Sequence, residues 1–225
     1  MELEFEYGFD LDEQQRIDNE NYLNKEDKNV DKEVGKGTGI MKPIPVDELM
    51  LTWKPTEWIV DLFGAKGSCV LLAGDKGSGK SVFMYRMAEA IQKGEIFMTE
   101  LSTKKSRVFV WQADESRNNA QAKIKLMELK KEKFCYLFKD DEYGHYLDIN
   151  VLRRTIQENN YKVVFIDSIT GLLMGNGINI KDSEFSKPLY KLNNLASELE
   201  ILIVISAHLT KEDRSEVNLN DILGT

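Results

Sequence analysis

The sequence predicts an α/β fold in which a mostly parallel, twisted sheet carries helices on both faces. Apolar, strand-like runs alternate with helical patterns along the chain, and this order builds such sheets. The run Val163–Ile166 is apolar throughout and rich in β-branched residues, as in a strand buried on both faces. A glycine-rich turn joins the strand-like run Cys69–Ala73 to a helical pattern, so we expect a ligand site at the carboxyl edge of the sheet.

Composition and charge limit the domain count and the classes of partner. A chain of 225 residues suits one α/β domain with a large core. The net charge of −8 is concentrated at the start, because residues 1–40 hold 12 acidic and 5 basic residues, a net of −7, which leaves −1 for residues 41–225. A nearly neutral body gives no overall nucleic-acid signature, although it does not exclude a local basic lining.

Cysteine usage and hydropathy favour a cytoplasmic protein. Cys69 and Cys135 lie in apolar strand-like runs without a CxxC pattern, so we expect buried, reduced thiols. No apolar run approaches the ~20 residues of a membrane span, and the amino terminus is acidic rather than a basic leader. We therefore expect no membrane partner.

The first segment is an acidic arm. Residues 1–40 are rich in Asp, Glu, Asn and Lys and end in a glycine-rich run, so we expect a disordered arm before a single folded domain at 41–225. Alternating apolar residues in 3–11 also suit strand addition to another surface. From Met41 three prolines punctuate an extended lead-in, which we expect to pack on the core, with Gly64–Gly67 forming a turn before the first strand.

The glycine-rich turn Gly74–Ser81 matches the pattern GxxxxGK[ST] of phosphate-binding loops. Glycines permit turns that a Cβ forbids, so successive N–H groups can point at phosphate oxygens, and the first turn of the following helix adds donors and its dipole. Lys80 would reach the β- and γ-phosphates, and the Ser81 hydroxyl would ligate Mg²⁺. The candidate nucleotide-binding residues form one run: Gly74, Asp75, Lys76, Gly77, Ser78, Gly79, Lys80, Ser81 and Val82.

Two helical patterns flank the next strand. The first begins near Ser81 and ends at Gly94, with Met84 and Met87 on its apolar face and therefore in the core. The strand Val108–Gln112 follows and ends in an acidic stretch. The second helix, over about 118–129, lies in a lysine-rich region, which is either a solvated face or a nucleic-acid contact.

The next part of the chain holds a second candidate for metal chemistry. A strand is expected at Phe134–Phe138, and Asp148 is expected to cap the helix after it. The buried strand Val163–Ile166 ends in Asp167, at the edge where open α/β sheets present ligands. With the glycine-rich turn upstream, we interpret Asp167 as the carboxylate that organises Mg²⁺, usually through water.

The last expected elements are a loop, a helix and a strand. Residues Gly171–Asp182 resemble a mobile loop with glycine pivots. Pro188 suits the first turn of a helix with leucines on its inner face. The strand Ile201–Ser206 then leads directly to His208 and Lys211.

This ordered set resembles the RecA-like P-loop ATPase core of the AAA family ATPases, in particular the branch of plasmid RepA-type and DnaB-type hexameric helicases and RadA/KaiC-like ATPases. Three blocks within about residues 45–225 carry the resemblance: the turn at 74–81, the strand that ends in Asp167, and the final strand with its His-x-x-Lys. Relatives continue beyond this point with a second DNA-facing loop and more strands. We therefore expect either a natural short form or a truncation.

The resemblance also implies roles for other side chains. An acidic residue after the second strand would polarise the attacking water; Asp114 is favoured by register and Glu115 by residue type, so both are candidates. His208 would be a polar sensor on a strand inserted beside the first strand, near the γ-phosphate. Lys211 would reach the nucleotide of a neighbouring subunit, or else be an exposed lysine without a role.

The resemblance implies an enzyme that binds and hydrolyses ATP with Mg²⁺. It further implies a homo-oligomer, as a ring or filament, that acts on single-stranded DNA as a helicase or a recombination or replication motor. The alternatives are a KaiC-like signalling ATPase and a non-hydrolysing, nucleotide-dependent binding module. A small-molecule kinase is less favoured, because its arginine-rich lid is missing and the only paired arginines, Arg153 and Arg154, lie in a helical pattern.

Overall fold

The computed structural model describes residues 43–129, 134–178 and 186–208. The expected arm at 1–40, the lysines at 130, 131 and 133, and Lys211 lie outside these ranges, so the boundary near residue 40 stays a prediction. The chain divides into two units, Met1–Lys54 and Pro55–Thr225, which we describe separately. Among the described residues, no helix has the length and apolar character needed to cross a membrane.

The described part of the first unit contains one short helix, α2 (Val46–Leu51). The prediction of an extended segment is wrong for these six residues, because they are helical. Their expected packing on the core stays a prediction. Two acidic residues in the first turn stabilise the helix by interacting with the positive end of its dipole. At the other end, Thr52 Oγ1 donates a hydrogen bond to the Leu49 carbonyl (3.1 Å). These local interactions outweigh the extended tendency of the flanking prolines.

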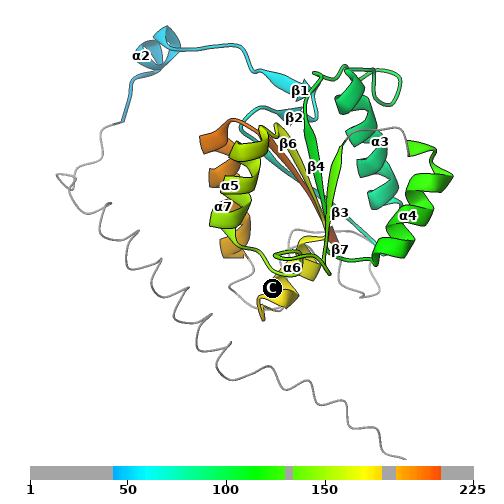
Figure 1. Ribbon diagram of the computed structural model, residues 1–225. Coiled ribbons are helices and arrows are strands. Elements are labelled where there is room, and N and C mark those ends of the chain that lie inside the picture. Colours follow the sequence, from blue (N-terminus) through cyan, green and yellow to red (C-terminus); the bar gives the residue numbers. More distant parts are fainter. Residues whose placement is uncertain (1–42, 130–133, 179–185, 209–225) are drawn as a thin grey trace, which may run out of the picture. The chain divides into compact units, whose positions relative to one another are not determined.

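A five-stranded sheet forms the centre of the second unit (Figure 1). The spatial order is β3-β7-β6-β4-β5, and every neighbouring pair is parallel. The bounds of the strands are β3 Cys69–Gly74, β4 Val108–Gln112, β5 Cys135–Phe138, β6 Val163–Asp167 and β7 Leu202–His208. This arrangement confirms the predicted parallel α/β sheet. It also confirms that the last strand lies beside the first strand of the sheet, β3.

Helices cover both faces of this sheet (Figure 1). On one face lie α3 (Lys80–Lys93) and α4 (Arg117–Leu126), and on the other lie α5 (Ile149–Asn159) and α7 (Ser186–Leu199). Each face has its own core cluster. Both β4 and β6 are buried along their whole length, as expected for strands covered on two sides.

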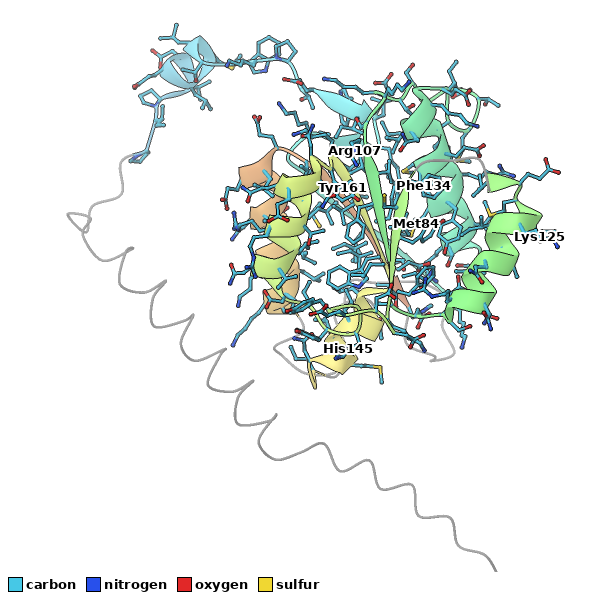
Figure 2. All side chains as sticks on the ribbon, in the orientation of Figure 1. Met84, Arg107, Lys125, Phe134, His145 and Tyr161 are labelled. Carbon is cyan, nitrogen blue, oxygen red and sulfur yellow. The ribbon has the colours of Figure 1, made fainter. Side chains whose placement is uncertain are left out.

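The expected ends of the helices follow local chemistry. Gly94 ends α3 in a left-handed conformation (φ 74°), and Met84 and Met87 are fully buried, as predicted. Asp148 caps α5, where its side chain accepts hydrogen bonds from the N–H groups of Asn150 and Val151. Figure 2 shows Met84 directed toward the sheet, whereas Lys125 of α4 points away from it.

Two predictions about the edges of this unit need correction. The expected turn at Gly64–Gly67 is wrong in its first half, where β2 (Gly64–Ala65) pairs antiparallel with β1 (Trp58–Val60) in a separate small sheet. Its second half is a turn before β3, closed by a hydrogen bond from the Ser68 N–H to the Ala65 carbonyl (3.2 Å). The expectation of two buried cysteines is wrong for Cys135, which is exposed because it begins β5, a strand at the edge of the sheet. Cys69 is partly buried, and this burial raises the pKa of its thiol to about 11.

The expected mobile loop after β6 is also wrong in its first part. Residues Ile169–Gly175 form helix α6, which follows β6 directly. The Ser168 hydroxyl accepts a hydrogen bond from the Gly171 N–H at the start of the helix (3.4 Å), and Leu172 and Leu173 are buried in the core. The remainder of the expected loop, from residue 179, lies outside the described residues.

Gly171 allows α6 to approach the end of β4 closely. A Cβ built at this position would lie 2.6 Å from the backbone oxygen of Ala113, just before the acidic stretch. We expect Gly171→Ala to lower the free energy of unfolding by ~1–3 kcal/mol, because the backbone must shift to admit the methyl group. At an open helix position the same change would stabilise the protein by up to ~1 kcal/mol.

Chemical denaturation of the wild type and the variant measures this difference. Met174→Ala is the control, because Met174 lies in the same helix and is largely exposed; its effect should stay within ~0.5 kcal/mol. An increase in stability of Gly171→Ala would contradict the close contact.

Candidate functional site

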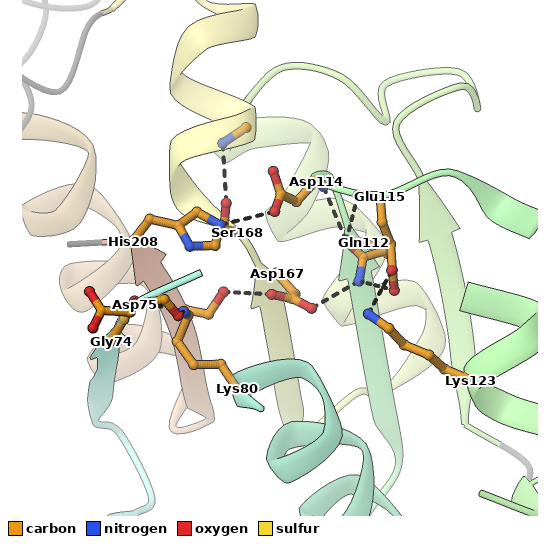
Figure 3. A network of polar contacts seen from close by, with 12 residues as sticks. Gly74, Asp75, Lys80, Gln112, Asp114, Glu115, Lys123, Asp167, Ser168 and His208 are labelled. Atoms are coloured by element: carbon orange, nitrogen blue, oxygen red, sulfur yellow. Dashed lines mark hydrogen bonds and ion pairs between the residues drawn. The ribbon is translucent and has the colours of Figure 1, made fainter. Parts of the chain in front are cut away.

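Strand register brings the predicted site residues to one edge of the sheet. Gly74 at the end of β3 pairs with His208 at the end of β7, and Gln112 at the end of β4 pairs with Asp167 at the end of β6. Because these strands are parallel, their carboxyl ends meet, and the residues that follow them share one site (Figure 3). The expected clustering of the glycine-rich turn, the acidic stretch, Asp167 and His208 is therefore observed.

The glycine-rich turn forms an exposed loop between β3 and α3. Gly77 and Gly79 adopt left-handed conformations, with φ of 85° and 90°. A Cβ placed on either glycine would meet no atom within 4 Å, so the space above the loop is open to a ligand. The first N–H groups of α3 have no partner within the helix and face this end. These features fit a bound phosphate chain, with Ser81 and the half-exposed Val82 in the first turn of α3.

Lys80 turns back over the loop from the first position of α3. It is only 8 % exposed, and its Nζ donates hydrogen bonds to the carbonyl oxygens of Gly74 (2.7 Å) and Asp75 (2.8 Å). Desolvation by burial lowers the pKa of Lys80, while the nearby carboxylates of Asp167, Asp114 and Asp75 act in the opposite direction. The ammonium group is thus held among negative groups, at the place where the γ-phosphate of a nucleotide is expected.

Asp167 lies at the centre of the site and is almost fully buried, with 3 % exposure. Its Oδ1 accepts a hydrogen bond from Ser206 Oγ at 2.6 Å, and its Oδ2 accepts one from Gln112 Nε2 at 2.9 Å. Each carboxylate oxygen has two lone pairs, so one remains on each for a water molecule. The geometry of Asp167 fits a carboxylate that holds Mg²⁺ through water; the role of the Ser81 hydroxyl as a second ligand stays a prediction.

Asp114 and Glu115, which sequence could not separate, have different surroundings. The side chain of Asp114 is 45 % exposed, and its Oδ2 lies 2.9 Å from His208 Nε2. The negative charge of Asp114 also acts to raise the pKa of Lys80. Asp114 therefore faces the same space as the glycine-rich loop.

Glu115 instead belongs to a packed network behind the site. Its side chain is only 15 % exposed, and its Oε2 accepts a hydrogen bond from Lys123 Nζ of α4 at 2.6 Å. Its Oε1 faces Tyr85 Oη (3.4 Å) and Gln112 Nε2 (3.3 Å). Both oxygens thus have structural partners. Lys123, one of the lysines in the region for which sequence left open a solvated face or a nucleic-acid contact, is instead paired with Glu115.

Sequence reasoning assigned no role to Gln112, Ser206 or Tyr85. All three are buried, and their polar groups support Asp167 directly or through one neighbour. Sequence offers a signal for Gln112 and Ser206, because each is a polar residue that follows an apolar run, at the end of β4 and two residues before the end of β7. Tyr85 gives no such signal, since a tyrosine on the apolar face of a helix is ordinarily a core residue.

Comparison with known proteins identifies the family. A family model described as "AAA domain" matches residues 40–214, which is well over half of the chain. The chain belongs to this AAA domain family. The predicted RecA-like P-loop ATPase core is thereby confirmed; the helicase branch stays a prediction.

The AAA domain is also similar to solved structures. One is a KaiC-like protein from the hyperthermophilic archaeon Pyrococcus horikoshii OT3, with 16 % sequence identity and a TM-score of 0.44. The match covers 67 % of this chain and 65 % of the archaeal one, so the chain spans about two thirds of that protein's length. A search of curated proteins found no match.

Proposed function

We propose that this AAA domain binds ATP with Mg²⁺ at the carboxyl edge of its sheet and hydrolyses it. The observation that carries the proposal is the convergence of Lys80, Asp167 and Asp114 beside an open, glycine-rich loop. These are the groups needed to hold a triphosphate, organise a metal and direct water at the terminal phosphate. A glycine turn by itself would support binding alone.

Each residue has a defined task in this proposal. The backbone N–H groups of the loop bind the β-phosphate, and Lys80 exchanges its two carbonyl partners for phosphate oxygens, where its charge offsets the negative charge that develops during transfer. Ser81 and Asp167 would hold Mg²⁺, which supplies charge neutralisation between the β- and γ-phosphates when bound. Ser206 and Gln112 keep the Asp167 carboxylate in one orientation.

Asp114, rather than Glu115, is the residue that we propose orients the attacking water. Asp114 is exposed toward the loop and influences Lys80, whereas both oxygens of Glu115 are engaged by Lys123, Tyr85 and Gln112. His208 lies against Asp114, which supports a sensor role, because movement of one side chain changes the hydrogen bond of the other. A positioned carboxylate within reach of a water is the usual requirement for this step.

We further propose that the domain assembles as a ring or filament of identical chains and acts on single-stranded DNA. The support is the resemblance to hexameric helicases, together with exposed Lys125 on the outer side of α4. Lys123 contributes less than its sequence suggested, because it is paired with Glu115. A KaiC-like signalling ATPase and a nucleotide-dependent binding module without hydrolysis are the competing functions.

Phosphate release from ATP, measured with and without single-stranded DNA, separates these functions. A DNA motor should be stimulated by the polynucleotide, and the stimulation should weaken between 50 and 200 mM salt, roughly as steeply as contacts to several phosphates require. Hydrolysis without stimulation at low salt would favour the signalling ATPase. ATP binding without hydrolysis would favour the binding module.

A further inference from the structure

The side chain of Gln112 lies at the centre of the polar network behind the site (Figure 3). It is fully buried at the end of β4, and both ends of its carboxamide are used. Its partners come from three parts of the fold: β6, α3 and the loop that follows β4. The backbones of β6 and the acidic loop are already joined, because the N–H groups of Ala113 and Asp114 donate to the Asp167 carbonyl (2.7 and 3.2 Å). Gln112 adds a link from this loop to the Asp167 carboxylate itself.

The hydrogen bonds of Gln112 fix its carboxamide in one orientation. Its Oε1 accepts from the backbone N–H groups of Asp114 (3.1 Å) and Glu115 (3.2 Å), which set the path of the acidic loop. Its Nε2 donates to Asp167 Oδ2 at 2.9 Å. The opposite orientation would direct the amide oxygen at a carboxylate and the NH₂ group at two N–H donors, so it is excluded.

The second hydrogen of the Gln112 amide is also accounted for. It faces Tyr85 Oη (3.1 Å) and Glu115 Oε1 (3.3 Å). Burial raises the pKa of Tyr85, so the phenol keeps its proton and its hydroxyl can donate to the Glu115 carboxylate (3.4 Å). A buried glutamine with all of these groups paired is costly to disturb, because each lost bond leaves a desolvated partner.

We infer that Gln112 is a positioning residue that holds the Asp167 carboxylate and the Asp114–Glu115 loop in one fixed relation. The inference rests on the proposed function, in which Asp167 serves the metal and Asp114 serves the water. One side chain bonds to both, so loss of the Gln112 amide frees the orientation of the Asp167 carboxylate relative to the loop, even though backbone hydrogen bonds still join the two segments. Small displacements of reacting groups lower the rate strongly while leaving ground-state binding nearly intact.

Ser206 provides a matched comparison. It is buried like Gln112, and its hydroxyl donates to the other oxygen of Asp167 at 2.6 Å. Among the described residues, the Ser206 hydroxyl bonds to Asp167 and makes no hydrogen bond to the acidic loop. Ser206→Ala should therefore disturb only the metal carboxylate, whereas Gln112→Met should disturb that carboxylate and the acidic loop together.

The experiment measures ATP hydrolysis by the full chain as a function of Mg²⁺ and of ATP. We expect Ser206→Ala and Gln112→Met each to raise the half-saturating Mg²⁺ concentration by about 10-fold. At saturating Mg²⁺, Gln112→Met should still lose about 10- to 100-fold in kcat, with the KM for ATP changed less than ~3-fold, while Ser206→Ala keeps most of its kcat. Gln157→Met, at an exposed glutamine of α5, is the control and should match the wild type.

Two results would overturn the inference: a wild-type Mg²⁺ dependence and kcat in Gln112→Met, or equal kcat values for Gln112→Met and Ser206→Ala at saturating Mg²⁺. If Gln112→Met melts below the assay temperature, Gln112→Asn takes its place in the Mg²⁺ measurement, because it keeps an uncharged carboxamide that is one methylene too short to reach both Asp167 and the acidic loop. Its half-saturating Mg²⁺ concentration should then rise by about 10-fold, and an unchanged value overturns the inference.

Failure of the proposed function gives a different result. If the wild type does not hydrolyse ATP, the proposed ATPase activity is rejected, whatever the Gln112 variants do. In that case, Mg²⁺-dependent binding of a fluorescent ATP analogue decides whether Gln112 positions Asp167. A shifted Mg²⁺ dependence in Gln112→Met supports the inference, and an unshifted one overturns it.

Discussion

Lys80→Ala is expected to abolish ATP turnover and to weaken nucleotide binding strongly. The Lys80 ammonium group bonds to the glycine-rich loop and interacts electrostatically with the carboxylate of Asp167. Its loss removes charge stabilisation of the transferring phosphate, so hydrolysis should fall by at least ~10²–10³-fold. The loss of charge-assisted hydrogen bonds should weaken ATP affinity by about 10- to 100-fold.

Phosphate release and fluorescent nucleotide binding measure these two effects. Lys105→Ala is a suitable control, because Lys105 is exposed and contacts the Gly94 end of α3, about 21 Å from Lys80 at 1.5 Å per helical residue. It should retain wild-type hydrolysis and affinity. Unchanged hydrolysis in Lys80→Ala would refute the site as a whole.

Asp114→Asn and Glu115→Gln are expected to behave in opposite ways. Asp114 faces the loop beside His208, so its amide variant should bind ATP normally and lose about 10²–10⁴-fold in kcat. Glu115 is paired with Lys123 in the network, so its amide variant should keep kcat within a few-fold and lose about 1 kcal/mol of stability.

Single-turnover hydrolysis and chemical denaturation of both variants provide the comparison. Because the residues are adjacent and each change is isosteric, each variant serves as the control for the other. Loss of hydrolysis in Glu115→Gln alone would show that Glu115, not Asp114, orients the attacking water. Equal activity of the two variants would show that neither residue does so.

Local chemistry made most of the sheet predictable. Continuous apolar runs marked β3, β4 and β6, and a glycine in the left-handed region ended α3 where expected. The helix α2 was missed because of local interactions, whereas the failure after β6 depends on contacts between distant parts of the chain. The first residues of the predicted loop Gly171–Asp182 belong instead to helix α6, in which Leu172 and Leu173 are buried in the core.

Individual residues of the candidate site could be predicted from the sequence, but the contacts between them could not. The glycine-rich loop and Asp167 are recognised from residue type and spacing alone. The choice between Asp114 and Glu115 required the positions of His208 and Lys123, which are distant in sequence. Gln112 was seen only as the end of a strand, because no sequence pattern shows that one amide will bond to two different carboxylate-bearing segments.

The most direct test of the account is ATP hydrolysis by the full chain, measured in Mg²⁺ and again with the metal removed by EDTA. The account predicts steady phosphate release that requires Mg²⁺ and falls to background in Lys80→Ala. Bound ATP that is released intact, at a rate no higher than that of Lys80→Ala, would contradict hydrolysis and leave a nucleotide-dependent binding module.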